Sequence, residues 1–560
     1  MRLHVKLPLV APVPLLAFLL AAVACSSPAP AAAPAGGGEV QPKVNRLVFA
    51  VPGPPVESND IELAPTSSWA MRPMYEHLIG LDPATNKFIP QLATEWKLEP
   101  DNKSYRFSLR KGVKFHFDKG EVTTKDIEFM LKGAVRQGEV RPTNSSYFGE
   151  LVEKIEVVND YEFVMRNRQP DADLINQLSE LVGVAWQLYS KQDFDDQGGY
   201  PTLASKRPLA ATGPYQFVER ATASYVRFER VPYQHWRIRP DFPEFEWRFM
   251  SEASSRTAAL LTGEVQVTSL PRDLKQQVLS QGMQLIRGKV PSQRTFLSMQ
   301  CCYLKDPAKP EQGLLYPESP LLDVRVRQAL NKAIKRDEMN KSFYNGQAEP
   351  MYLNHFHPTR QAWNPDWEKR FPQAYGYDPD AAKKLLADAG YGPGHPLKTN
   401  MNMVKLPDVA ESEDLQEAIA GYWRSIGVDV TLVTLDNTAR NNRQRARGFD
   451  NHFTVVGTSS HQLYGIFVYN VSFFATGSTG TYTKEIDAMW PPLGRELDPK
   501  RQDELYRQIG DKLYDSFLGV PLFWLPAEAI ANSKYVSDWI FPGSISGTWT
   551  HVETIKAVSK

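Results

Sequence analysis

A helix pattern runs directly into a strand pattern between residues 415 and 432. The apolar residues recur at the spacing that lines one face of an α-helix: Leu415, Ala418, Ile419, Tyr422, Trp423 and Ile426. Gly427 follows at the position where helices commonly end, and Val428, Val430 and Leu432 then alternate as in a strand. A helix that enters a strand through so short a turn is an α/β crossover element. The pattern therefore predicts an α/β fold.

Helix-start signals recur elsewhere in the chain. Thr123 with Asp126 has the spacing of a capping box, Asp323 precedes an amphipathic run, and Asp378 with Pro379 forms an N-cap and first-turn pair. Strand patterns occur at 46–51 and in two hairpins, which turn at 100–102 and at 159–160. Alternating helices and strands from about 300 to 520 predict an open-sheet domain, and the N-terminal half predicts a second one.

The charge balance limits the choice of partners. The chain has 64 Lys and Arg residues against 64 Asp and Glu residues, so its formal net charge is zero. Without a basic or acidic excess, neither nucleic acid nor an anionic membrane surface is an expected partner. The 560 residues are enough for two or three domains.

Cysteines are few. The chain has Cys25 and the adjacent pair Cys301 and Cys302, so no framework of disulfides is expected. Neighbouring cysteines can form a vicinal disulfide, but we expect this pair to be two buried thiols that pack as small apolar groups.

The N-terminus has the layout of a secretory signal. Arg2 and Lys6 precede the apolar run 7–24, which ends in small residues before Cys25. Three prolines within the run disfavour a permanent membrane span. The cut site resembles a bacterial lipobox, although Ala22 stands where leucine is commonest. We therefore expect a signal peptide at 1–24, a lipidated Cys25 and a flexible tether over 25–41, with ordinary signal cleavage as the alternative.

An ordered set of motifs resembles the family 5 extracellular solute-binding proteins, which are oligopeptide, dipeptide and nickel receptors of ABC importers. The motifs are YEHLIGLDP (75–83), PQLATEW (90–96), YRFSLRKGVKFHF (105–117), TTKDIEFML (123–131), TGPY (212–215), VRVRQALNKAIKRDEMNKSFYNGQAEP (324–350), YDPDAAKKLLADAGY (377–391) and VPLF (520–523). The resemblance covers about residues 45–540.

The resemblance implies a periplasmic binding protein-like class II fold, in which two lobes surround a hinged cleft. Lobe one would hold residues 42–290, with an inserted subdomain at about 86–210, and the returning segment 521–560. Lobe two would hold residues 291–520. It also implies an exported, lipid-anchored monomer that passes a peptide-like or other small polar solute to permease and ATPase subunits. No enzymatic activity and no cofactor are expected.

In peptide-binding relatives, a lobe-two loop supplies an aspartate to the amino terminus of the peptide. The corresponding residues 454–470 contain no acidic residue. A buried ammonium without a partner is costly, so we expect a solute other than an ordinary small peptide, or an amine that meets Glu57 or Asp60. The expected solute contacts are Trp69, Tyr147, Trp186, Thr458, Ser459, Ser460, His461 and Tyr464.

Rival functions remain at this point. His461 raises the nickel branch of the family, but His355 and His357 are expected to be surface histidines, and no metal site is predicted. An exported hydrolase is disfavoured because neither a G-x-S-x-G elbow nor an H-E-x-x-H pair occurs. A periplasmic sensor or chaperone that uses the same cleft is the other alternative.

Overall fold

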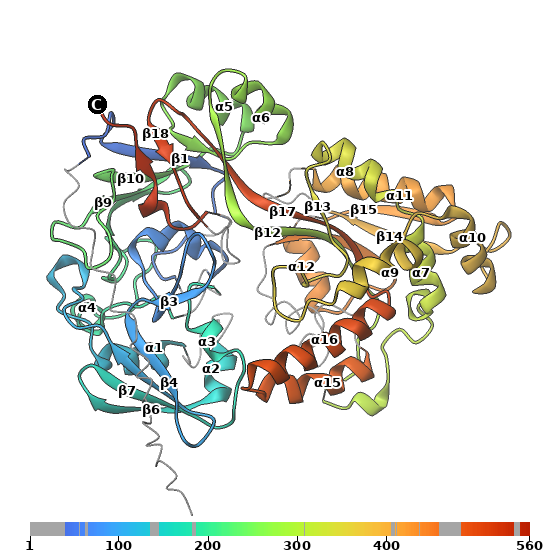
Figure 1. Ribbon diagram of the computed structural model, residues 1–560, viewed down its shortest axis with the longest axis horizontal. Coiled ribbons are helices and arrows are strands. Elements are labelled where there is room, and N and C mark those ends of the chain that lie inside the picture. Colours follow the sequence, from blue (N-terminus) through green and yellow to red (C-terminus); the bar gives the residue numbers. More distant parts are fainter. Residues whose placement is uncertain are drawn as a thin grey trace, which may run out of the picture. The chain divides into compact units, whose positions relative to one another are not determined.

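The computed structural model of the chain describes residues 40–54, 57–61, 65–134, 145–181, 186–306, 308–404, 409, 411–435, 437–458, 483–541 and 549–560 (Figure 1). Residues 39–560 form one compact unit, and the described residues all belong to it.

An 11-stranded mixed sheet runs through the unit. Its strand order is β15 (Asp429–Thr434), β14 (Lys398–Met403), β16 (His452–Thr458), β12 (Gln284–Gln300), β17 (Val520–Ala531), β11 (Val267–Thr268), β1 (Arg46–Val51), β10 (Glu244–Phe249), β9 (Tyr225–Arg230) and β8 (Tyr215–Ala221), while β13 (Glu349–Pro350) pairs with β17. We call residues 40–290 and 527–560 the first lobe, and residues 291–526 the second lobe, because the pairing of β12 with β17 is interrupted at Pro291 and Pro526. Among the described strands, β12 and β17 are the two that run from one lobe into the other, and we call them the hinge strands.

The hinge strands lose their regular pairing where they cross between the lobes. Gln284–Arg287 pair with Ala531–Glu528 in the first lobe, and Gln293–Leu297 pair with Leu525–Val520 in the second. Between these segments the register shifts, and Pro291 stands opposite Pro526. Because proline has no backbone N–H, neither residue donates a ladder hydrogen bond. The strand pair is therefore weakest at the crossing, which is where a hinge would bend.

Helices cover the second-lobe part of the sheet. They are α7 (Val324–Lys332), α8 (Arg336–Tyr344), α10 (Pro379–Asp388), α11 (Ser412–Ser425) and α12 (Asn437–Arg445). Leu297 of β12 and Phe453 of β16 share a buried core with Leu415 and Trp423 of α11. A further core surrounds Trp367 and Tyr514 and is built by α9 (Pro365–Tyr375), α15 (Lys484–Arg495) and α16 (Pro499–Asp515).

The predicted helix starts are confirmed by capping contacts. Asp126 accepts a hydrogen bond from the backbone N–H of Thr123 at 2.9 Å, at the start of α1 (Thr124–Ala134). The Asp323 side chain caps α7, and that of Asp378 caps α10. The helix predicted before Gly427 is α11, and the strand after it is β15.

The first lobe contains a second, four-stranded sheet. Its order is β4 (Ala93–Leu98), β5 (Tyr105–Leu109), β7 (Glu162–Asn167) and β6 (Val152–Asn159), so the two predicted hairpins are confirmed. The other elements of this lobe are η1 (Pro65–Met74), β2 (Ile79–Leu81), β3 (Phe88–Pro90), η2 (His116–Asp118), α2 (Ser145–Leu151), α3 (Leu174–Gln177), α4 (Lys191–Gln197), α5 (Ala253–Thr262), α6 (Arg272–Leu279), β18 (Val536–Asp538), η6 (Val552–Thr554) and β19 (Lys556–Ala557), together with α1.

Two predictions about side chains are wrong. Cys301 and Cys302 are buried as expected, but they form a vicinal disulfide instead of two thiols. Adjacency in the chain already places the two sulfur atoms within bonding reach, and disulfides persist in oxidising compartments. His355 and His357 are buried rather than exposed. His357 is held in the interior by Glu349, whose carboxylate lies 2.9 Å from Nε2.

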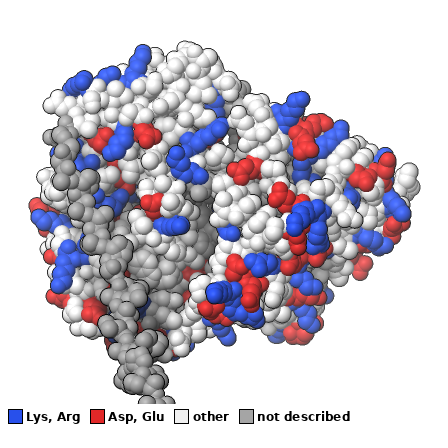
Figure 2. Space-filling view, in the orientation of Figure 1, with Lys and Arg blue, Asp and Glu red and all other residues white. Residues whose placement is uncertain are grey.

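The surface carries both charges. On the face shown in Figure 2, basic and acidic side chains lie beside one another, and no broad field of one sign is visible. Within the described ranges, no helix combines the length and apolarity needed to cross a bilayer.

Candidate ligand-binding site

A cavity of about 190 Å³ lies beside the hinge strands, with walls from both lobes. From the hinge strands, the lining includes Leu285, Arg287, Gln293, Leu525, Pro526 and Glu528. From the rest of the first lobe, it includes Arg256, Ser269, Leu270, Lys275 and Trp549. From the second lobe, it includes Tyr344, Asn345, Gln347, Ala348 and Glu411. An engineered cavity of about 150 Å³ binds benzene, so this one has room for a small solute. Because its walls belong to both lobes, its size depends on the hinge angle.

Arg256 places a positive charge in the first-lobe wall. The residue is 5% exposed, and its hydrogen bonds go to three backbone carbonyls, those of Met250, Ser251 and Ser269. These bonds use Nε and Nη1, so Nη2 is not engaged by them. Burial lowers the pKa of the guanidinium. The side chain remains a cation whose position is fixed by the backbone, and it suits an acidic group.

A chain of polar contacts crosses the cavity wall from lobe to lobe. Glu528 of β17 accepts hydrogen bonds from Lys275 of α6 and from Arg287 of β12, each at 2.7 Å. Arg287 also donates through Nη2 to the side-chain oxygen of Gln347 at 2.7 Å. With Arg256 and Glu411 included, the cavity has three cations against two carboxylates. The charged side chains that line the cavity therefore carry a net positive charge.

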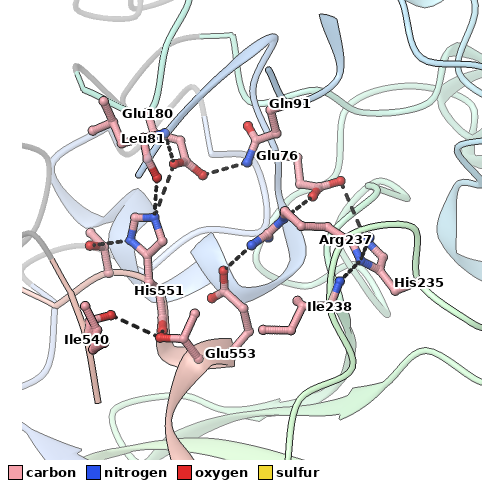
Figure 3. Close-up of polar contacts among 12 residues, drawn as sticks. Glu76, Leu81, Gln91, Glu180, His235, Arg237, Ile238, Ile540, His551 and Glu553 are labelled. Carbon is pink, nitrogen blue, oxygen red and sulfur yellow. Dashed lines mark hydrogen bonds and ion pairs between the residues drawn. The ribbon is translucent and has the colours of Figure 1, made fainter. Parts of the chain in front are cut away.

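Trp549 connects this cavity to a buried network in the first lobe. Its indole N–H donates to the carbonyl of Glu528 at 3.3 Å, and the ring also lines a smaller cavity of about 40 Å³. Charged groups around the smaller cavity join the C-terminal segment to loops of the first lobe (Figure 3). Arg237 binds Glu76 at 3.1 Å and Glu553 at 2.8 Å, and His551 lies 3.4 Å from Glu180. This network holds in place the C-terminal segment that carries Trp549.

The pKa values within the network follow from its pairing. Burial alone would raise the pKa of Glu76, but His235 and Arg237 outweigh burial and lower it to about 2. Burial alone would lower the pKa of His551, but Glu180 raises it above its ordinary value. Burial is the largest influence on the pKa of His77 and lowers it to about 4. Glu76 is therefore ionised and His77 neutral near neutral pH.

Three predicted contact residues lie in the first lobe, and none of them lines either cavity. Trp69 packs edge-on against Trp247, with ring centres 5.2 Å apart, and Trp247 lines the smaller cavity. Tyr147 donates its hydroxyl to Asp171 at 2.6 Å. Trp186 is 3% exposed and packs against Phe148. A role for them in solute binding stays a prediction.

The second-lobe predictions are described only at their first residue. Thr458 ends β16, and its Cα pairs with that of Arg294 in β12, next to the cavity-lining Gln293. Ser459, Ser460, His461 and Tyr464 lie outside the described residues, as does Cys25. Glu57, considered above as a partner for an amine, is bound by Arg220 and by the backbone N–H of Ala223. These sites stay predictions.

Sequence reasoning missed Arg256, Arg287, Glu528 and Trp549. Arg287 and Glu528 are paired in register but stand 241 residues apart in the chain. No local periodicity reveals such a pair. Arg256 comes soon after the start of α5, as many surface arginines do in other helices. Only its burial in the structure distinguishes it from them.

Comparison with known proteins places the chain in a family. The profile described as bacterial extracellular solute-binding proteins, family 5 Middle, matches residues 87–474. This range is more than half of the chain, so the chain belongs to family 5 of the bacterial extracellular solute-binding proteins. Its two-lobed α/β fold is of the periplasmic binding protein type.

The chain is also similar in sequence to one curated relative and in fold to two solved structures. The dipeptide-binding protein of Escherichia coli K12 is 27% identical over 65% of this chain and 66% of its own length, just under two thirds. The dipeptide-binding protein of a Pseudoalteromonas species, solved with Met-Leu, superposes with a TM-score of 0.72 at 21% identity, over 92% of this chain and 100% of its own. NikA from Brucella suis, solved with Fe(III)-EDTA, gives a TM-score of 0.74 at 19% identity, with the same coverage.

Proposed function

We propose that this protein is the solute-binding receptor of an ABC importer. It would capture a peptide-like or other small polar solute between its lobes and deliver it to a membrane permease. The observation that carries the proposal is the cavity at the hinge strands, which is walled by both lobes. A solute that touches both walls favours the closed arrangement by the difference between its affinities for the two states.

The charges of the cavity favour a solute with an acidic group. Arg256 offers a fixed guanidinium, while Lys275 and Arg287 share Glu528. The carboxyl terminus of a peptide or the acid group of another small metabolite would meet this requirement. Glu411, on the opposite wall, would oppose a second negative charge.

Binding measured by calorimetry tests this proposal. The panel should contain Met-Leu, its C-terminally amidated form and small carboxylic acids. We expect at least one acidic solute to bind at one per chain, and Arg256→Gln to weaken it tenfold or more, as the loss of a charged hydrogen bond of about 1.5–3 kcal/mol requires. Arg501→Gln, on the surface of α16, is the control.

A second variant distinguishes an effect of charge on binding from damage to the fold. Glu411→Gln should strengthen the binding of the same solute, because it removes a like charge, whereas damage to the fold would weaken binding. Binding that is indifferent to both substitutions, or equal for Met-Leu and its amide, would contradict the acidic-group proposal.

The remaining parts of the proposal concern the cell. We propose that residues 1–24 are removed, that Cys25 carries a lipid anchor and that the monomer acts with permease and ATPase subunits without enzymatic activity. The mass of the purified N-terminal peptide tests lipidation. A sensor or chaperone with the same cavity is the alternative, and solute uptake lost on gene deletion and restored by the protein would favour import.

A further inference from the structure

The smaller cavity, of about 40 Å³, is lined by two buried side chains whose polar atoms have no hydrogen-bond partner among the described residues. His77 is 3% exposed, and neither of its ring nitrogens is hydrogen-bonded to a described group. Trp247 is 1% exposed, and its indole N–H donates to no described group. A buried polar group without a partner destabilises a fold. Two such groups on the wall of one cavity indicate a polar guest.

The fold sets the position of both residues on this wall. The backbone N–H of His77 donates to the side-chain oxygen of Gln91 at 2.7 Å. Trp247 lies in β10, and its ring packs against Phe49 and Trp69, with ring centres 4.8 and 5.2 Å away. The two residues are therefore held beside the cavity by first-lobe contacts and do not need a guest to bring them there.

Cations outnumber carboxylates in the described lining. Arg72 and Arg237 are charged at neutral pH, and His551 adds a third positive charge when it is protonated. The carboxylates are Glu180 and Glu553, and both already have partners: Figure 3 shows Glu180 beside His551 and Glu553 beside Arg237. The charge of the lining therefore favours an anion over a cation.

The unpaired groups are mainly hydrogen-bond donors. The indole of Trp247 can only donate, and neutral His77 donates through one of its ring nitrogens. Arg237 uses Nε for Glu76 and Nη1 for Glu553, so its Nη2 group makes no hydrogen bond to a described residue. In the described part of the chain, no cluster of His, Cys, Asp and Glu is suited to hold a metal ion. Donors of this kind bind anions.

The volume limits the size of the guest. One water molecule takes up about 30 Å³ of liquid, so a cavity of about 40 Å³ holds a single small ion and excludes a whole peptide.

We propose that the smaller cavity is a binding site for one small monoanionic group, of the size of chloride, nitrate or a carboxylate. Trp247, His77 and Nη2 of Arg237 would donate hydrogen bonds to it, and Arg72 would supply further positive charge. These residues come from the end of η1 and the loop after it, from β10 and from the loop after β9. Because the unfolded chain does not assemble these groups, a bound anion stabilises the folded state.

The melting temperature of the full chain, measured without solute, tests the site. Chloride or nitrate replaces the large sulfonate of HEPES at constant pH and ionic strength. We expect a saturable rise that fits one site. His77→Leu should abolish this rise, while its melting temperature in the sulfonate should equal or exceed that of the unmodified chain, because an unpartnered buried polar group is removed.

A second variant and a control address the donor directly. Trp247→Phe removes the indole N–H, so half-saturation should require at least tenfold more chloride. Trp96→Phe, a partly buried tryptophan of β4 that does not line the cavity, should keep the response of the unmodified chain. An equal response to chloride in the unmodified chain and in His77→Leu, or no response in either, would overturn the site.

Crystals grown with bromide give a measurement that does not depend on stability. We expect an anomalous peak in the smaller cavity within hydrogen-bond distance of His77 and Trp247 in the unmodified chain. Density for water alone, without an anomalous signal, would overturn the proposal.

The monoanionic group can come from two sources, a free anion or the acid group of a solute that reaches past Trp549, which lines both cavities. Calorimetry of an acidic solute with and without chloride distinguishes them. Competition by chloride identifies the acid group of the solute, whereas equal or stronger binding in chloride identifies a free anion. This comparison alone rests on the proposed function. The melting and bromide experiments contain no solute, so either proposal can fail without the other.

Discussion

Arg237 joins parts of the chain that are more than 300 residues apart. It binds Glu76 next to η1 and Glu553 near the C-terminus, and both carboxylates are buried. Glu76 belongs to the motif 75–83, and it accepts hydrogen bonds from the side chains of Trp236 and Arg237. The role of Arg237 could not be predicted, because its two partners are identified only once the C-terminal segment has returned to the first lobe.

Replacing Arg237 by Gln should lower the free energy of unfolding by about 3 kcal/mol, since two buried carboxylates lose their shared cation. Urea denaturation followed by tryptophan fluorescence measures this loss. Arg501→Gln, which breaks an exposed pair with Glu504, should cause no comparable change. Equal effects of the two substitutions would show that the network does not stabilise the fold.

The pair His551 and Glu180 predicts a pH dependence of stability. Since Glu180 raises the pKa of His551 above its unfolded value of about 6.5, the pair stabilises the fold fully below pH 6.5. This stabilisation is lost as the pH rises through the raised pKa. Urea midpoints measured from pH 6 to 9 should fall in the unmodified chain and fall less in His551→Gln. His395→Gln, at an exposed position, should keep the unmodified profile.

At the scale of elements, the predictions that depend on neighbouring residues are confirmed, whereas the pairing of distant strands was not predicted. The capped starts of α1, α7 and α10 depend on residues three or fewer positions apart, so the sequence predicts them. The pairing of β12 with β17 joins segments more than 200 residues apart, and the cavity forms along that pairing. The residues that line the cavity were therefore not among the predicted contacts, and the predicted contacts themselves stay predictions.

Close packing of α16 against α9 predicts opposite effects for two glycine substitutions. A Cβ at Gly510 of α16 would stand 2.5 Å from the buried ring of Trp367, whereas a Cβ at Gly421 of α11 meets no atom within 4 Å. Alanine favours a helix over glycine by about 1 kcal/mol. Gly421→Ala should therefore raise the melting temperature, while Gly510→Ala should lower it by overpacking. An increase in the melting temperature of both variants, measured by scanning calorimetry, would contradict the packing described for α16.

At the scale of the whole molecule, two lobes are joined in the described part of the chain by two strands whose pairing is irregular where they cross. The charged cavity lies beside these strands, and its walls come from both lobes. The resemblance of the motifs predicted the two lobes. It could not predict the charge of the cavity, because that charge comes from side chains on both hinge strands and on both lobes.

Small-angle X-ray scattering of the full chain, titrated with a solute that binds in calorimetry, tests whether the lobes close on one small guest. We predict that the radius of gyration falls as solute is added, reaches its limit at one solute per chain, and that the solute is recovered chemically unchanged. Saturated binding with an unchanged scattering curve, or recovery of an altered solute, would contradict this account.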